Sequence, residues 1–117
     1  MATDEVRRFA LSLPEVSEEP HHHFASFRVR GKIFATLPPD EVRLHVFVPE
    51  ERRHVALATH PDAYEKLWWG KKVVGLRVIL SKAKLADVES MLDCERGSKK
   101  GARSPLYTQR LGVAFTD

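Results

Sequence analysis

Residues 25–37 read ASFRVRGKIFATL, a stretch in which apolar and polar side chains alternate on either side of a Gly-Lys pair. Ala25, Phe27 and Val29 fall on one side of an extended chain, whereas the residues between them are polar or basic. This alternation predicts a half-buried strand with a basic outer face. The Gly-Lys pair can turn the chain, so residues 33–37 are predicted to return as the second strand of a hairpin.

The same period of two predicts two further strands. Over residues 42–48 apolar residues alternate with Arg43, His45 and Phe47, directly after a Pro-Pro-Asp-Glu turn signal. Residues 74–80 alternate in the same way. The first three predicted strands follow one another as a meander at the centre of the domain, and the fourth joins later in the chain.

Helices are predicted in three places, where apolar residues recur at helical spacing. The first begins with Thr3 as its N-cap and stops before Pro14, because the residue before a proline avoids helical backbone angles. The second runs from Pro49 to about Ala58, with two acidic residues in its first turn. A third, amphipathic helix starts at Leu85.

The segments between these elements are predicted to be irregular. Residues 15–20 are acidic and contain a proline, which is typical of a loop. Asp62 is predicted to cap a short turn that ends at Leu67, and residues 68–72 are predicted to form a turn or a tight strand entry. Gly97 is predicted to be the C′ residue that ends the last helix.

The 117-residue length suits one domain with one core, and 43% apolar residues with 30% charged residues is ordinary globular composition. We therefore predict a single two-layer α+β domain over residues 1–96, an antiparallel sheet with flanking helices, and a basic extension over residues 97–117. The chain has no apolar run of transmembrane length and no signal-peptide pattern, and Cys94 is its one cysteine. These features favour a cytoplasmic protein with no membrane partner.

Positive charge is concentrated in the later part of the chain. The formal net charge is +3, but residues 1–20 carry five acids against two arginines and the remaining residues carry 17 basic against 11 acidic side chains. Residues 66–84 contain six basic side chains and no acid. This distribution permits polyanion binding, and it also fits an ordinary set of solvated lysines.

The chemistry-bearing residues do not converge on a catalytic or metal site. His21, His22 and His23 cannot all face one ion in a strand, because neighbouring side chains alternate sides, so they are predicted to form an exposed polar strand entry. The paired acids lie at turn or helix-start signals, and Cys94 is predicted to be half-buried helix packing. No nucleophile elbow or glycine-rich phosphate loop is present. We expect no enzyme activity, no metal and no cofactor.

Two features indicate binding. Trp68 and Trp69 lie beside a Gly-Lys-Lys turn, where an indole could stack on a base while the ammonium groups contact phosphates. The alternative is that at least one of the two tryptophans caps the core. The second feature is a set of six basic residues, which strands of one sheet could bring together on its outer face. The alternative is that some of them pair with acids on a helix. The six residues are Arg28, Arg30, Lys32, Lys71, Lys72 and Arg77.

Two strings, SFRVRGKIFA over residues 26–35 and LWWGKKVVGLR over residues 67–77, resemble the MmcQ/YjbR family. The helix ending LPEV at residues 13–16 and the helix start VPEE at residues 48–51 are similar too, and the resemblance covers roughly residues 4–95. It implies a fold of the type grouped with frataxin-like (CyaY-like) or secretion-chaperone-like architectures. It also implies a proposed DNA-binding role through a double-wing arrangement of the sheet, without a catalytic residue.

Carried over onto this sequence, the wing candidates of the first string are Arg28, Arg30 and Lys32. Those of the second string are Lys71, Lys72 and Arg77. Relatives tend to continue the last helix into an Ala-Pro-Lys-like ending, whereas residues 97–105 here are basic and helix-breaking. The resemblance therefore leaves out residues 97–117.

We expect a non-enzymatic cytoplasmic protein that binds nucleic acid, double-stranded DNA first of all, through backbone phosphates and with little sequence discrimination. The alternative is a protein-binding or small-ligand-binding module. An exposed apolar patch around Trp68 or Phe47 would favour the alternative, whereas a wide basic sheet face would favour DNA.

Overall fold

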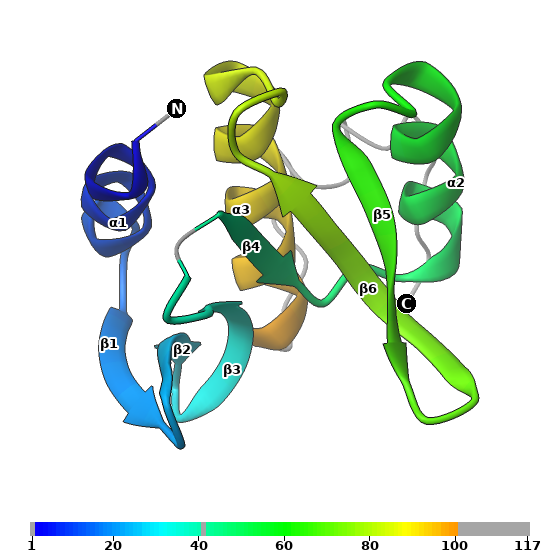
Figure 1. Cartoon of the computed structure of the whole chain (residues 1–117). Helices are drawn as coiled ribbons and strands as arrows, with labels where there is room; N and C mark the ends of the chain where they lie inside the picture. Colours follow the sequence, from blue (N-terminus) through cyan, green and yellow to red (C-terminus); the bar gives the residue numbers. More distant parts are fainter. Residues whose placement is uncertain (1, 41, 101–117) are drawn as a thin grey trace, which may run out of the picture.

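The computed structural model describes residues 2–40 and 42–100 of the chain. Within these ranges an α+β fold combines one six-stranded antiparallel sheet with three helices (Figure 1). This confirms the fold class predicted from the sequence. In chain order the elements are α1 (Thr3–Ser12), β1 (Val16–His21), β2 (Phe24–Val29), β3 (Lys32–Leu37), β4 (Arg43–Val46), α2 (Glu50–Thr59), β5 (Tyr64–Trp69), β6 (Lys72–Ile79) and α3 (Leu85–Lys100).

The strand order in the sheet is β1-β2-β3-β4-β6-β5, so the predicted meander lies at its centre. The β2–β3 hairpin turns at Arg30 and Gly31, which both have positive φ, the conformation that a tight two-residue hairpin turn favours. Strand β4 pairs on its other side with β6, which arrives after α2 and β5. The four predicted strands are therefore confirmed as β2, β3, β4 and β6.

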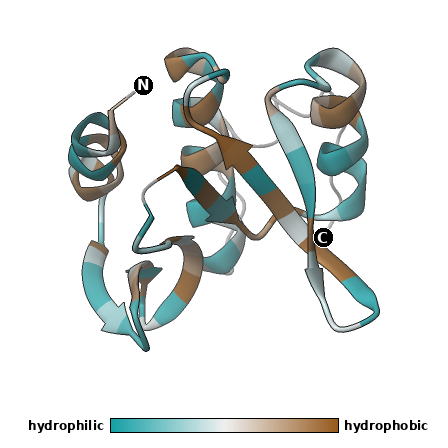
Figure 2. Cartoon of the chain, in the orientation of Figure 1, coloured by the Kyte–Doolittle hydropathy of each residue, from teal (hydrophilic) through white to brown (hydrophobic). Residues whose placement is uncertain are grey.

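The helices cover one face of the sheet and leave the other face open. Both α2 and α3 pack on the sheet, and α1 packs against α3 and β1 (Figure 1). Strand β6 is mostly brown in Figure 2 and is interrupted by a teal segment, as expected for a central strand whose core face is apolar. The core lies between the layers. Its sheet residues include Phe27, Val29, Ala35, Leu44, Val46, Leu76 and Val78, and its helix residues include Val6, Ala10, Val88 and Leu92.

The predicted loop over residues 15–20 is wrong, because Val16–His21 is strand β1 and pairs with β2 over all six residues. This strand lies at the edge of the sheet and buries little side-chain surface, so it shows no apolar alternation. Glu18 accepts a hydrogen bond from Arg7 Nε of α1 at 2.9 Å. The main-chain carbonyl of Glu19 accepts a further hydrogen bond from Ser26 Oγ at 2.6 Å. Main-chain pairing and these two contacts hold the strand in place.

The predicted turn after Asp62 is also wrong. Tyr64–Trp69 is strand β5, which pairs with β6 as the other edge of the sheet. The hairpin turns at Gly70 and Lys71, and Gly70 has a φ of 62°. Only Tyr64 is buried in this strand, so its sequence carries no period of two.

Two helix ends differ from the sequence predictions. Ala2 is the N-cap of α1 in place of Thr3, and its N–H donates to Glu5 Oε1 at 3.1 Å. Gly97 does not end the last helix, because its φ is not in the left-handed region and α3 continues to Lys100. The predicted boundary between residues 96 and 97 falls inside this helix, and residues 101–117 of the predicted extension lie outside the described residues. No helix in the described part of the chain is long and apolar enough to cross a membrane.

Candidate functional site

The open face of the sheet carries a groove of about 280 Å³ between the β1–β2 hairpin and the β5–β6 hairpin. Thr36 and His45 form part of it, and they alternate with the core residues Ala35 and Val46, so they face away from the helices. We call this site the aromatic groove. It is lined by His21, His22, Phe24, Thr36, His45, Phe47, Leu67, Trp68, Trp69 and Val74.

A β-bulge lies opposite the two adjacent tryptophans that line the groove. The β5–β6 register shifts between Leu67, which pairs with Gly75, and Trp68, which pairs with Val73, so the extra residue is Val74 of β6. Trp68 is 58% exposed and Trp69 is 75% exposed. The prediction that one of the two caps the core is therefore wrong. The Trp69 ring lies 6.5 Å, centroid to centroid, from the ring of Phe47.

The β1–β2 hairpin contributes the opposite wall of the groove. The predicted exposure of the three histidines is confirmed. His21 closes β1, and His22, with a φ of 58°, and His23 form the turn that leads into β2. The ring of Phe24, at the start of β2, lies 5.8 Å from the ring of His45. The groove was not predicted from the sequence, although Phe47 occupies a position of the alternating pattern where Arg43 and His45 are polar, which could have indicated an apolar open face.

His45 is a partly buried polar residue of the groove, next to the buried Thr36. Burial, above all, lowers its pKa below the ordinary value of 6.5, and the charge of Arg77 lowers the pKa further, while Asp40 opposes the shift. The imidazole is therefore neutral at pH 7. Arg43 donates from Nε to Glu65 Oε1 at 2.9 Å, and Arg77 Nη1 lies 3.9 Å from the same oxygen. Two guanidinium groups thus share one carboxylate beside His45.

The six predicted basic residues are spread over two corners and the middle of the sheet. Arg30 lies in the β2–β3 turn and Lys32 directly follows the turn, at the opposite end of β2 from the histidines, and Arg30 pairs with Glu15 at 3.5 Å. Arg28 donates to Ser26 Oγ at 3.0 Å and so lies along its own strand.

Arg77 lies on β6, two strands away from β3, and is paired with Glu65. Lys71 and Lys72 are exposed at the β5–β6 hairpin, directly after the two tryptophans. They make no ion pair with any residue that the structure describes. Of the predicted basic residues, these two lie closest in the chain to the aromatic groove.

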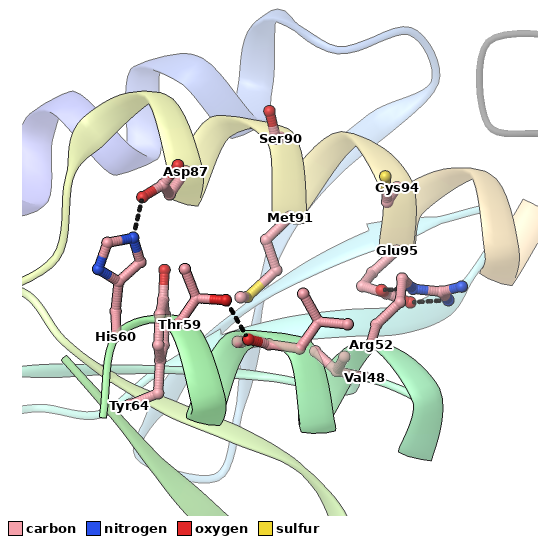
Figure 3. Close-up of a pocket in the computed structure, with 12 residues that line it drawn as sticks. Val48, Arg52, Thr59, His60, Tyr64, Asp87, Ser90, Met91, Cys94 and Glu95 are labelled. Atoms are coloured by element: carbon pink, nitrogen blue, oxygen red, sulfur yellow. Dashed lines mark hydrogen bonds and ion pairs between the residues drawn. The ribbon is translucent and has the colours of Figure 1, made fainter. Parts of the chain in front are cut away.

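A second concavity, of about 340 Å³, lies between α2 and α3, and we call it the α2–α3 cleft (Figure 3). At one end Arg52 donates to both oxygens of Glu95, at 2.7 and 2.9 Å. At the other end His60 Nε2 lies 3.5 Å from Asp87 Oδ2. Met91 lies between the two pairs in Figure 3. These two pairs thus join α2 and its C-cap residue His60 to α3.

The pKa values in the cleft follow from burial. Glu95 is 1% exposed, and burial raises its pKa against the opposing hydrogen bond and charge of Arg52. Burial also raises the pKa of Tyr64, with a contribution from Asp87. Cys94 is buried, which differs from the half-buried position predicted, and its thiol points away from α2 in Figure 3. Among residues 2–40 and 42–100, no three His, Cys, Asp or Glu side chains are grouped to hold a metal ion.

Comparison with known proteins places the chain in a family. No curated protein matches it. The crystal structure of Deinococcus radiodurans protein DR2400, described as a DUF419 domain, is similar, with a TM-score of 0.71 and 21% sequence identity. That similarity covers 97% of this chain and 89% of the other, and it supports the fold. The YjbR family model matches residues 11–94, most of the chain, and contains both strings on which the resemblance rested. The chain therefore belongs to the YjbR family.

Proposed function

We propose that this chain is a non-enzymatic cytoplasmic protein that binds nucleic acid, double-stranded DNA included, by contacting backbone phosphates from the open face of its sheet. The observation that carries the proposal is the β5–β6 hairpin. Lys71 and Lys72 are exposed on it, beside two exposed indole rings. Ammonium groups that are not paired with carboxylates are available to displace counterions from phosphates, which is the main source of affinity that does not depend on sequence.

The arginines differ in how much positive charge they leave available for phosphates. Arg77 and Arg43 share Glu65, so the pair retains positive charge at the middle of the open face. Arg30 is partly neutralised by Glu15, and together with Lys32 it lies at another corner of the sheet. We expect the β5–β6 hairpin to contribute most of the phosphate contacts.

The first test is a fluorescence-anisotropy titration of a labelled DNA duplex at several salt concentrations. If phosphates carry the affinity, the logarithm of the binding constant falls linearly with the logarithm of salt, with a slope of about 0.9 for each phosphate contacted. The variant K71E/K72E weakens binding to duplexes of every sequence and reduces that slope. Absence of binding by the wild-type chain at low salt would contradict the proposal.

A charge-matched control separates local contact from net charge. Lys82 and Lys84 are exposed in the turn between β6 and α3, at the far end of β6 from the hairpin tip. The variant K82E/K84E changes the net charge by the same amount, and we expect it to leave most of the affinity in place. An equal loss in both variants would show that overall charge, and not the hairpin, governs binding.

The alternative, a protein-binding or small-ligand-binding module, is favoured by one specific observation. The two tryptophans expose apolar surface that a monomeric protein usually buries. A chain that binds no duplex at low salt, and whose tryptophan fluorescence is unchanged by nucleic acid, would point to such a partner.

A further inference from the structure

We infer that the aromatic groove accepts unpaired nucleobases, so that the preferred ligand of this face is single-stranded nucleic acid or an opened duplex. The inference rests on the proposed function and names the class of nucleic acid that the same face selects. Phosphate contacts alone do not distinguish a paired strand from an unpaired one, because both present the same backbone charge. The discrimination has to come from groups that contact bases.

The lining of the groove has the composition of a stacking surface. Seven of its ten lining residues carry rings, and none carries a carboxylate. The rings are two indoles, two phenyl groups and three imidazoles, and the imidazole of His45 is neutral at pH 7. Aromatic side chains stack on bases with little regard to sequence, because every base has a π-face.

The arrangement of the rings leaves faces available to a ligand. Trp69 and Phe47 approach to 6.5 Å between ring centroids with their planes tilted by 34°, so they are not stacked on each other. Phe24 and His45 are tilted by 56°. Trp68 and Trp69 both line the groove, and more than half of each side chain remains exposed.

Cations lie at two sides of these rings. Lys71 lies in the turn that follows Trp69, and Lys72 begins β6 as the register partner of Trp69. From the helix layer, Lys99 of α3 places Nζ 5.6 Å from the ring centroid of Phe47. A strand whose bases enter the groove therefore meets the positive charge of Lys71 and Lys72 where its backbone passes the β5–β6 hairpin. Aromatic rings flanked by cations are the combination found in proteins that bind single strands.

Intact duplex cannot use this surface in the same way. In a double helix each base stacks on its neighbours and pairs across the helix, so the π-faces are covered. A groove that offers ring faces gains affinity only from bases that have left the stack. We therefore expect the groove to favour single strands over duplex, whereas the lysines of the hairpin contribute to both.

The chain has two tryptophans, and both line the groove, so its intrinsic tryptophan fluorescence reports on this site alone. We would titrate the protein with a 12-nucleotide single strand of thymidylate, an abasic strand of equal length and a 12-base-pair duplex. Stacking predicts strong quenching by the thymidylate strand and little quenching by the abasic strand at equal saturation. It also predicts affinity for the thymidylate strand at least about tenfold above that for the abasic strand.

Variants identify the residues responsible, with affinity followed by the anisotropy of labelled strands. We expect W68A/W69A to lose about tenfold or more in affinity for the thymidylate strand and little for the duplex. Both side chains are largely exposed, so the variant is expected to fold. Leu11→Ala, which shortens an exposed apolar side chain on α1, is the matched control and should bind as the wild type does.

The outcomes separate this inference from the proposed function. Equal affinity for the abasic, thymidylate and duplex ligands, with W68A/W69A unchanged, overturns the groove as a base site and leaves phosphate binding standing. Failure of all three ligands to bind at low salt overturns the proposed function itself, and the inference with it. Selective loss of single-strand binding in W68A/W69A supports both.

Discussion

Gly75 of β6 allows the main chain at the end of β4 to approach β6 closely. A Cβ atom added there would overlap the carbonyl oxygen of Val46 and press against the main chain of Phe47, neither of which can move without shifting the strand. We expect Gly75→Ala to lower the free energy of unfolding by about 1–3 kcal/mol, the usual range for overpacking a tight site. Urea denaturation followed by circular dichroism measures this change.

Gly97 provides the opposite case in the same protein. It lies inside α3, nothing lies within 4 Å of an added Cβ, and its φ is not positive. Gly97→Ala should therefore raise the free energy of unfolding by roughly 0.5–1 kcal/mol, because glycine loses more backbone freedom in a helix than alanine does. If Gly75→Ala raises the urea midpoint as Gly97→Ala does, the close approach at Gly75 is not as described.

At the level of single residues, the sequence predicted the core better than the surface. Phe27, Val29 and Val46 are buried as the alternation required, because burial on one sheet face imposes a period that the sequence must keep. The two tryptophans were not predictable in the same way. They lie on an edge strand in which only Tyr64 is buried, so no pattern of burial in the sequence fixes the side to which they point.

Among the elements, α2 and α3 are joined by the ion pair of Arg52 and Glu95. The Arg52 side chain is 14% exposed and that of Glu95 is 2% exposed, so water does not replace a lost partner. We expect Arg52→Ala to lower the free energy of unfolding by about 3–5 kcal/mol at neutral pH, because it leaves a buried carboxylate without its cation. Thermal and urea unfolding measure the loss.

The pH dependence of this variant follows from the raised pKa of Glu95. A raised folded-state pKa means that the folded chain holds a proton which the unfolded chain releases near the ordinary value of 4.5. The stability associated with Glu95 is therefore full below that value and is lost as the pH rises through the folded-state pKa. Without Arg52, which opposes the shift, the pKa rises further, so the defect should be largest near pH 8 and shrink towards pH 5.

A control in the same helix tests whether burial is the reason. His54 lies 3.6 Å from Glu50, and both side chains are more than three-quarters exposed. His54→Ala should change the free energy of unfolding by less than about 1 kcal/mol. A small, pH-independent effect of Arg52→Ala would contradict the assignment of Glu95 as a buried carboxyl that depends on its partner.

The elements that the sequence predicted are those with a buried face. Helices α1 and α3 and strands β2, β3, β4 and β6 have one, and each appears at or near its predicted residues. Helix α2 has no buried residue, but Ala56 and Leu57 pack partly buried against the core, and its proline and acidic start signals predicted it. Strands β1 and β5 were missed because each is an edge strand with few buried side chains. Their positions depend on main-chain pairing with β2 and β6, which leaves little trace in local composition.

For the whole molecule, the family and the fold could be predicted, and the groove could not. The two family strings end up in different hairpins, and their basic residues were visible from the start. The groove exists because the sheet brings the β1–β2 and β5–β6 hairpins to one face, although β1 and β5 lie at opposite edges. Neither of these edge strands was predicted, so their convergence could not be predicted either.

Strand β1 is an edge strand, and its free edge affects whether the protein aggregates at high concentration. An exposed strand edge is a template on which another chain can add a strand, and natural proteins block such growth with charges and prolines. Strand β1 carries exposed Glu19 and Pro20, and a proline offers no N–H to an incoming strand. We expect Pro20→Val to fold but to aggregate at a lower protein concentration than the wild type, as measured by light scattering. The control Pro39→Val, which lies in a turn away from the edge, should aggregate at the same concentration as the wild type. Solubility would then depend on a residue that contributes nothing to the core.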